Sequence, residues 1–344
     1  MLLAIAMAVS LSPESEGAYK QPQLAVNDKM VAVTFGSGQS VQFAASTDGG
    51  STFTKPVQVF PQPGQEGKLP IGRHRGPRIA FSGDWIVISA IVGQKGGGAD
   101  GDLFSWRSRD SGKTWSKGVR VNDAEGSARE GLHAMAAGGG ILFSTWLDLR
   151  GKGTKLYGSM SRDGGATWLK NTLVYESPDG TICQCCHPSV KVTAQGEVLA
   201  MWRNALGGSR DMYVARSTDG VKFTPAQKQG TGTWPLNACP MDGGDLTFTP
   251  EGKLWSAWRR DDRIVLAAPD GKEKIQGGGK DPAMALGKKG PVVAWTDHGL
   301  QLLAPGETSP RLLDPAGAFA NLAAGSHVYG AWESGKSIRI ARLD

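Results

Sequence analysis

The sequence predicts an all-β protein made of many short strands joined by tight turns. Glycine supplies 49 of the 344 residues, about twice its average share in proteins. Hydrophobic residues make up 40% and charged residues 20% of the chain, which is too apolar a composition for a disordered protein. So many glycines disfavour a helical bundle, and the lack of a three-residue glycine period excludes collagen.

Residues 1–11 form an apolar stretch, and residues 12–20 form a polar one. The apolar stretch is too short to span a bilayer, and no other segment is apolar enough, so we expect no membrane span. Two interpretations of residues 1–20 stay open: a secretory signal that lacks its basic start, or a β-strand that closes the fold. We expect residues 21–344 to form one domain, since no linker or low-complexity stretch interrupts them.

Four segments share a pattern of serine, aspartate, glycine and an aromatic residue. They lie at 46–53, 108–115, 161–168 and, one residue shorter, 217–223. The first three fit S-x-D-x-G-x-T-[WF]. An aspartate that accepts hydrogen bonds within its own turn, a glycine with positive φ and an aromatic that packs beneath them describe a hairpin corner. We therefore expect structural roles for Asp48, Asp110, Asp163 and Asp219.

A second repeat, an apolar strand that ends in a large residue, recurs along the whole chain. Its copies end at Phe35, Ile91, Trp146, Trp202, Trp258, Trp295 and Trp332. The spacings are 56, 55, 56, 56, 37 and 37 residues, and periods with room for four strands are typical of a β-propeller. This count predicts a single propeller of seven four-stranded antiparallel blades, with six blades plus an appended strand set as the alternative. The last unit lacks a fourth strand, which residues 2–11 could supply.

The serine–aspartate–glycine segments resemble the Asp box, or bacterial neuraminidase repeat, of the sialidase superfamily. The resemblance implies a sialidase-like propeller with an arginine triad, a Tyr–Glu nucleophile pair and an Asp acid/base. It also implies an F/Y-R-I-P motif, which residues 77–80 match only in part. None of the five tyrosines stands beside a glutamate in a loop between the second and third strands of a unit, where an activated phenol is expected. The sequence therefore assigns no catalytic residues and leaves open whether the protein is an enzyme.

All four cysteines lie in the two segments that lead into the fourth and fifth units. Cys183 and Cys239 both precede the aromatic of their repeat by 19 residues, and Cys185 and Met241 both precede it by 17. Equivalent positions in adjacent blades are neighbours at the mouth of a propeller. We therefore expect one soft-metal site formed by Cys183, Cys185, Cys186, His187, Cys239 and Met241. Thiolates with a thioether favour a copper ion, and a zinc ion is the alternative.

Two other interpretations of the cysteines stay open. They could form structural disulfides in an interaction scaffold, such as Cys183–Cys239 across the blades and a vicinal Cys185–Cys186 bond. They could also carry redox or nucleophilic chemistry through a thiolate paired with His187.

Basic residues near the same mouth define an alternative function, a glycoside hydrolase or glycan-binding protein with an anionic ligand. Its candidate residues are His74, Arg78, His133, Arg203 and Arg259. The net charge of +6 contains no dense basic run, so we expect no nucleic-acid partner. The glycine-rich stretches fit no phosphate-loop pattern, so we expect no nucleotide cofactor. The apolar start and the cysteines together suggest a secreted or periplasmic protein.

Overall fold

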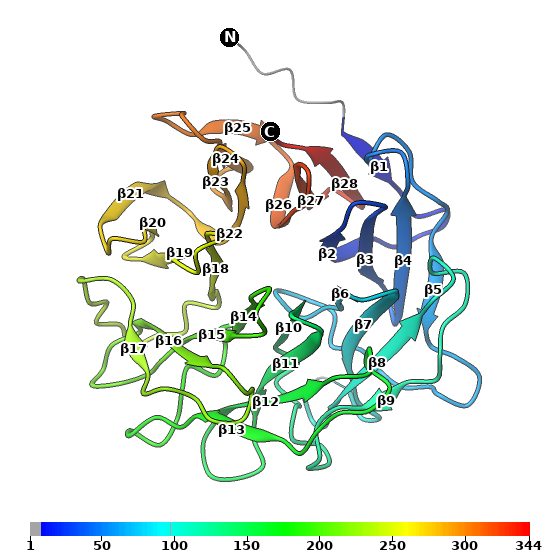
Figure 1. Cartoon of the computed structure of the whole chain (residues 1–344), viewed down its shortest axis with the longest axis horizontal. Coiled ribbons are helices and arrows are strands. Elements are labelled where there is room, and N and C mark those ends of the chain that lie inside the picture. Colours follow the sequence, from blue (N-terminus) through cyan, green and yellow to red (C-terminus); the bar gives the residue numbers. More distant parts are fainter. Residues whose placement is uncertain (1–7, 97) are drawn as a thin grey trace.

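Seven four-stranded sheets stand in a ring around a central axis, which makes the structure a seven-bladed β-propeller (Figure 1). The computed structural model describes residues 8–96 and 98–344. Within these residues all sheets are antiparallel and no α-helix occurs. The first strand of each blade is innermost and the last is outermost (Figure 1). The prediction of seven blades is thus confirmed, and the six-bladed alternative is wrong.

Blades 1 to 4 each take four consecutive strands. Their bounds are β2 (Tyr19–Val26), β3 (Val31–Ser37), β4 (Ser40–Ser46), β5 (Val57–Phe60), β6 (Arg78–Ser82), β7 (Trp85–Val92), β8 (Asp102–Ser108), β9 (Val119–Arg120), β10 (His133–Gly138), β11 (Ile141–Asp148), β12 (Lys155–Ser161), β13 (Thr172–Tyr175), β14 (Ser189–Val192), β15 (Val198–Arg203), β16 (Met212–Ser217) and β17 (Gln227–Lys228).

Blades 5 to 7 follow the same order, except that the last strand of blade 7 comes from the start of the chain. Their bounds are β18 (Gly244–Phe248), β19 (Leu254–Arg260), β20 (Arg263–Ala267), β21 (Glu273–Gly278), β22 (Lys280–Gly287), β23 (Gly290–Thr296), β24 (Leu300–Leu303), β25 (Arg311–Asp314), β26 (Gly317–Ala324), β27 (Val328–Ser334), β28 (Ser337–Arg342) and β1 (Val9–Leu11).

The two ends of the chain meet in blade 7 (Figure 1). β1 pairs with β28 in antiparallel register, with Val9 opposite Ile340 and Leu11 opposite Ile338. The ring is therefore closed by strand pairing between the beginning and the end of the chain. The part of the expected closing strand at residues 2–7 lies outside the described residues.

The hydrophobic core lies between adjacent blades, because each sheet is covered on both faces by its neighbours. All eight residues of β11 are buried for this reason. The large residues that end the second repeat fill these interfaces, and five of them are at most 1% exposed: Phe35, Trp146, Trp202, Trp295 and Trp332. The Trp146 indole donates to Asp148 Oδ2 at 2.8 Å, which satisfies its polar N–H inside the core. The repeated large residue, whose spacing indicates the number of blades, therefore also packs adjacent blades against each other.

Each Asp box closes the turn between the third and fourth strands of its blade. After β8, the Ser108 hydroxyl donates to Asp110 Oδ1 at 2.8 Å, and the N–H and hydroxyl of Thr114 donate to the same carboxylate at 3.0 and 2.6 Å. The boxes at Asp48 and Asp163 repeat all three contacts. Because third strands run away from the crossings into the next blade, the boxes lie on the face opposite those crossings.

Replacing Asp110 by asparagine should lower the melting temperature, because an amide cannot accept all three hydrogen bonds. The hydrogen bond from the Thr114 hydroxyl is the main cause that lowers the pKa of Asp110 to about 2. This carboxylate therefore stabilises the fold above its unfolded pKa of about 3.9, and the effect is lost as pH falls through about 2. Thermal unfolding followed by circular dichroism should show a gap between wild type and Asp110→Asn that closes below about pH 4. A gap that stays constant down to about pH 2 would contradict this account.

Candidate functional site

The crossings between blades bring the candidate residues to one end of the central channel. Each crossing runs from the outer strand of one blade to the inner strand of the next, so the crossings converge where the inner strands begin. The crossing from β13 to β14 carries three cysteines, and the crossing from β17 to β18 carries the fourth. The thiols of two neighbouring crossings can therefore meet at this end of the channel.

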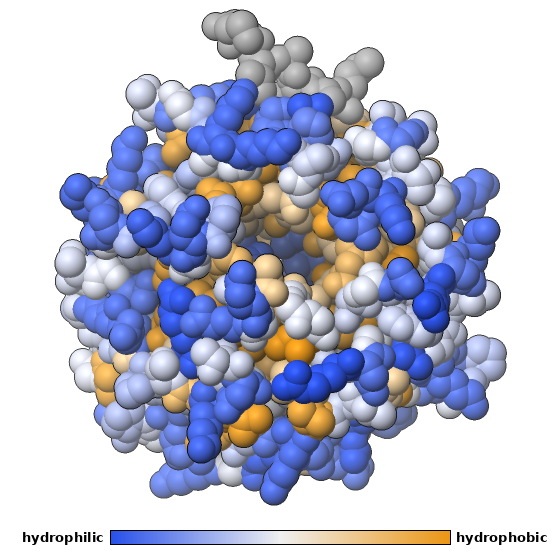
Figure 2. Space-filling view, viewed as in Figure 1, coloured by the Kyte–Doolittle hydropathy of each residue, from blue (hydrophilic) through white to orange (hydrophobic). Residues whose placement is uncertain are grey.

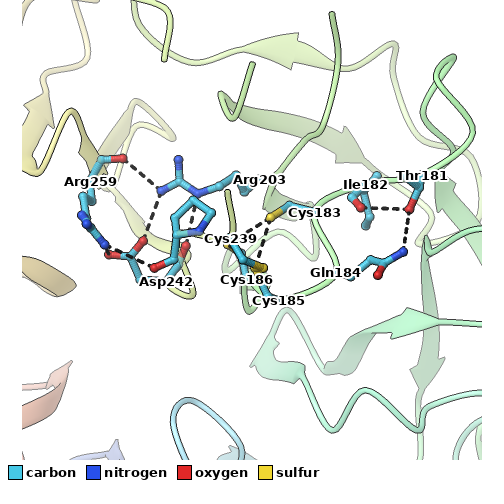
Figure 3. The surroundings of a disulfide bond; sticks show 11 residues. Thr181, Ile182, Cys183, Gln184, Cys185, Cys186, Arg203, Cys239, Asp242 and Arg259 are labelled. Atoms are coloured by element: carbon cyan, nitrogen blue, oxygen red, sulfur yellow. Dashed lines mark hydrogen bonds and ion pairs between the residues drawn. A yellow bond between two sulfur atoms is a disulfide. The ribbon is translucent and has the colours of Figure 1, made fainter. Parts of the chain in front are cut away.

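The four sulfur atoms form one compact group (Figure 3), which we call the thiol cluster. Cys185 and Cys239 form a disulfide that joins the two crossings, while Cys183 and Cys186 are free thiols. Cys183 Sγ lies 3.6 Å from Cys185 Sγ and 3.3 Å from Cys186 Sγ. The sulfur atoms of Cys185 and Cys186 are 3.8 Å apart.

The disulfide pairing corrects the pairing considered from the sequence. Equal spacing suggested a bond between Cys183 and Cys239, whereas Cys185 is the partner of Cys239. The reason is that the Cys183 N–H donates to the Arg203 carbonyl at 3.1 Å, which ties Cys183 to its own blade and leaves its side chain 4% exposed. The following turn carries Cys185 to the exposed Cys239. The vicinal bond is also absent from the described cluster, and two thiols stay free where the scaffold interpretation expects none.

Burial and hydrogen bonding give the two free thiols different acidities. The hydrogen bond with Cys186 is the main cause that lowers the pKa of Cys183 to about 7. Burial raises the pKa of Cys186 well above its usual value. Cys183 is therefore the first of the two to become a thiolate, which is the form that binds metals and attacks disulfides.

His187 and Met241 follow the cysteines in sequence but take other places. The His187 ring stacks on the His74 ring with centroids 4.1 Å apart, and its Nδ1 accepts a hydrogen bond from the Gly243 N–H at 3.1 Å. Burial holds the pKa of His187 well below its usual value, so the ring is neutral. Met241 has a left-handed φ of 61°. In the described part of the chain, the group of potential ligands that the sulfur atoms of the thiol cluster form contains Cys183, Cys185 and Cys186 and does not include His187.

A cavity of about 100 Å³ lies in the channel where the inner strands begin. A view down the ring axis shows the centre of the molecule hollowed, with hydrophobic residues around the hollow (Figure 2). Four lining residues of the cavity have φ between 50° and 58°: Gln21, His74, Asp281 and Phe319. Such left-handed backbone costs about 1–3 kcal/mol for a non-glycine residue and clusters at functional sites. We call these four residues the channel cluster.

A short polar contact joins two members of the channel cluster. His74 Nε2 lies 2.8 Å from Asp281 Oδ1, and Asp281 Oδ2 is buried without a hydrogen-bond partner. Burial, followed by the positive charge of Arg78, lowers the pKa of His74 to about 3. In its Nε2–H tautomer, neutral His74 donates to the ionised Asp281 carboxylate, and burial raises the pKa of this carboxyl group. Asp281 Oδ2 remains as an acceptor for a hydroxyl or N–H group of a ligand.

Comparison with known proteins places the chain in a family. The model of the BNR repeat-like domain matches residues 78–267, more than half of the chain. The protein belongs to this family. A search of curated proteins finds no match. In the described residues, no helix is long and apolar enough to cross a membrane.

Solved structures share the fold of this BNR repeat-like protein at low sequence identity. A protein of unknown function from Dyadobacter fermentans is 17% identical, with a TM-score of 0.58 and 99% of both chains covered. An α-L-arabinanase from Penicillium chrysogenum is 12% identical, with a TM-score of 0.62 and 99% of both chains covered. The Hadza microbial sialidase is 15% identical, with a TM-score of 0.54, and the match covers 95% of this chain and 66% of the sialidase.

In this BNR repeat-like protein, Arg203 joins blades 4 and 5. Its side chain is 1% exposed and donates to the carbonyls of Arg210, Asp242 and Arg259 at 2.7, 3.2 and 3.0 Å. Burial outweighs the attraction of the two arginines and raises the pKa of Asp242 to about 6. Arg259 itself donates to the carbonyl of Pro240 at 3.2 Å. Both candidate arginines, Arg203 and Arg259, thus donate hydrogen bonds to backbone carbonyls of the fold.

Arg78 and His133 are also bound within the fold. The Arg78 guanidinium donates to three backbone carbonyls in the segment 74–77 at 2.9–3.1 Å, and burial lowers the pKa of Arg78 to about 10. His133 is fully buried, with its Nε2 3.0 Å from the Ser89 hydroxyl and its Nδ1 without a partner. Of the five residues predicted for ligand binding, only His74 and Arg78 line the described cavity.

The sequence prediction missed three members of the channel cluster. Gln21 and Asp281 each stand between a lysine and a proline, in K-Q-P and K-D-P, at the start of an inner strand. Aligning these two tripeptides would have placed both residues at the mouth. Phe319 has no comparable signal in its neighbours.

Replacing Arg203 by alanine should destabilise the fold by about 3–5 kcal/mol, because three buried carbonyls and the Asp242 carboxylate lose their partner. Urea unfolding followed by tryptophan fluorescence measures this change. The matched control is Arg109→Ala, since Arg109 is 62% exposed and pairs with an exposed aspartate, so its loss should cost less than about 1 kcal/mol. Equal effects of the two substitutions would contradict the structural role of Arg203.

Proposed function

We propose that the protein binds a soft metal ion at the thiol cluster, with copper as Cu(I) the first candidate and Zn²⁺ the second. The observation that supports this function is the triangle of sulfur atoms of Cys183, Cys185 and Cys186, which all lie within 4.8 Å of one another. Cys239 adds a fourth thiol when its disulfide with Cys185 is reduced. The donors would then come from two adjacent blades.

The size of the triangle suits a metal–thiolate site. At a metal–sulfur bond of about 2.3 Å, sulfur atoms lie about 3.8 Å apart in a tetrahedral site and about 4.0 Å apart in a planar three-sulfur site. The three sulfur–sulfur distances of the triangle are 3.3, 3.6 and 3.8 Å. Small side-chain movements are therefore enough to admit an ion.

The donor set selects among metals by softness. Thiolates favour Cu(I) and Zn²⁺ over the hard cations Mg²⁺ and Ca²⁺, which prefer oxygen. Cys183 and Cys186 are 4% and 1% exposed, so an ion between them is shielded from water. Three sulfurs suit Cu(I), whereas structural Zn²⁺ needs a fourth ligand, which Cys239 would supply after its disulfide is reduced.

We also propose that the protein is exported. The Cys185–Cys239 disulfide supports this location, because such bonds persist in oxidising compartments and are rare in the cytosol. The apolar stretch at residues 1–11 is consistent with export.

Protein purified anaerobically with a reductant and without chelator should carry about one equivalent of copper or zinc per chain, measured by inductively coupled plasma mass spectrometry. Its thiols should react with a thiol reagent only after a chelator has removed the metal. The double substitution Cys185→Ser and Cys186→Ser should abolish metal binding, since it removes two of the three sulfurs of the triangle. Met241→Leu serves as a control that removes a thioether and keeps every thiol. An unchanged metal content in the double variant would refute the proposal.

A second candidate function is glycan binding at the channel cluster. It is supported by the four strained residues that line one cavity and by the unpartnered Asp281 Oδ2, which can accept a hydrogen bond from a sugar hydroxyl. The arabinanase and a GH93 α-L-arabinofuranosidase of Fusarium graminearum, both solved with arabinobiose, share the fold with TM-scores of 0.62 and 0.56. Because Arg78, Arg203 and Arg259 are engaged with carbonyls, a neutral glycan suits this cluster better than an acidic one.

Isothermal titration calorimetry with arabinobiose and with sialyllactose tests this second function. His74→Asn should weaken binding about tenfold or more, because it removes the partner that orients Asp281, while asparagine tolerates the left-handed backbone. The matched control is His298→Asn, at another left-handed position with φ of 49° and a 99% exposed side chain. Failure of both sugars to bind, or equal affinity in the two variants, would exclude glycan binding by this cluster.

A further inference from the structure

The disulfide of the thiol cluster lies between solvent and two buried thiols. Cys239 is exposed and Cys185 is half-buried, whereas Cys183 and Cys186 are buried. The sulfur of Cys183 lies 3.6 Å from Cys185 Sγ, which is close to van der Waals contact. Thiol–disulfide exchange begins from such a contact, since a thiolate attacks a disulfide sulfur directly.

We propose that Cys183 exchanges with the Cys185–Cys239 disulfide, so that the bond moves from between two blades into the crossing before β14. The thiolate sulfur of Cys183 attacks Cys185 Sγ, and a Cys183–Cys185 bond forms. The Cys185–Cys239 bond breaks, and its electron pair leaves on Cys239 Sγ. Cys239 then takes up a proton from solvent, which replaces the proton that Cys183 released. One disulfide exists before and after the step, so no external oxidant or reductant takes part.

Cys183 is better placed for this step than Cys186. The Cys186 sulfur lies 3.8 Å from Cys185 Sγ, against 3.6 Å for Cys183. A Cys185–Cys186 bond would also join consecutive residues, whose Cα atoms are about 3.8 Å apart, below the range of about 4.4–6.8 Å that a disulfide prefers. A Cys183–Cys185 bond spans one intervening residue, which allows a wider separation.

The exchange has a consequence for metal binding that rests on the proposed metal function. Either position of the disulfide leaves two free thiols: Cys183 and Cys186 in one form, Cys186 and Cys239 in the other. Four thiols exist only after an external dithiol has given two electrons and two protons to the disulfide and has itself been oxidised to a disulfide. The cluster therefore takes up its metal in the reduced protein and excludes it in the oxidised protein, so the exported protein binds metal only where a reductant reaches the disulfide.

Peptide mapping locates the disulfide, because trypsin separates the two crossings. Peptide 171–191 contains Cys183, Cys185 and Cys186, and peptide 229–253 contains Cys239. Full-length, metal-free, oxidised protein is incubated with iodoacetamide in the absence of reductant, digested and analysed by mass spectrometry. Exchange releases Cys239, and alkylation traps it. Peptide 229–253 should therefore accumulate in an alkylated, unlinked form, while peptide 171–191 gains an internal disulfide.

Two single substitutions assign the attacking thiol. Cys183→Ser should slow the trapping of Cys239 about tenfold or more, because the nearest nucleophile is gone. Cys186→Ser is the matched control: it removes the other buried thiol but keeps a hydroxyl that can hydrogen-bond to Cys183, so Cys239 should be trapped within about threefold of the wild-type rate. Near-ultraviolet circular dichroism verifies that both variants are folded. The exchange is refuted if wild-type Cys239 is never trapped, or if Cys183→Ser traps it as fast as the wild type.

Metal content of the reduced and oxidised proteins separates this proposal from the metal function itself. If the redox state of the disulfide controls metal uptake, the reduced protein should carry about one equivalent of metal per chain and the oxidised protein at most about a tenth of that. Equal metal content of both forms would refute control of metal uptake by the disulfide but would leave the proposed metal site intact. Absence of metal from both forms would overturn the metal function, whereas the trapping experiment, which contains no metal, still decides the exchange.

Discussion

The hydrogen bonds of one buried guanidinium hold together the two crossings on which the thiol cluster depends. Arg203, at the end of β15, donates to one carbonyl in blade 4, to the Asp242 carbonyl in the crossing before β18 and to the Arg259 carbonyl in β19. A buried guanidinium is costly unless its donors are satisfied, so these carbonyls must keep facing it. The Arg203 carbonyl in turn accepts the N–H of Cys183. One residue thus fixes Cys183 on one side and the segment that follows Cys239 on the other (Figure 3).

The fold could be predicted from the sequence because the repeats reflect packing that every blade shares. The aromatic that ends each second strand must fill an interface between blades, and each Asp box must close its own turn, so their spacing counts the blades. The arrangement of residues at the mouth was harder to predict, because it depends on contacts between residues that are far apart in the sequence. Equal spacing predicted a disulfide between Cys183 and Cys239. The backbone hydrogen bond from Cys183 to Arg203 instead keeps Cys183 in its own blade, and Cys185 forms the disulfide with Cys239. The left-handed Asp281 lies at a register shift in β22, and the only local sign of this shift is the K-D-P tripeptide, which matches K-Q-P at the shift in β2.

The two candidate sites are neighbours in the chain as well as in space. Cys186 belongs to the thiol cluster, and the next residue, His187, stacks on His74 of the channel cluster. His187 also accepts the Gly243 N–H, one residue after Asp242, whose backbone carbonyl binds Arg203. A change in the conformation of residues 183–186 therefore shifts the next residue, His187, and with it the ring that stacks on His74 of the channel cluster. The thiol cluster and the channel cluster are therefore held in place by the same two crossings.

The central claim is that the thiol cluster is a soft-metal site, and X-ray absorption spectroscopy at the copper and zinc edges tests it most directly. Anaerobically reduced, full-length protein loaded with one equivalent of metal is the sample. The account predicts a first coordination shell of three or four sulfur atoms at about 2.2–2.3 Å. A first shell of nitrogen and oxygen only, or a metal that stays in free solution, would contradict it.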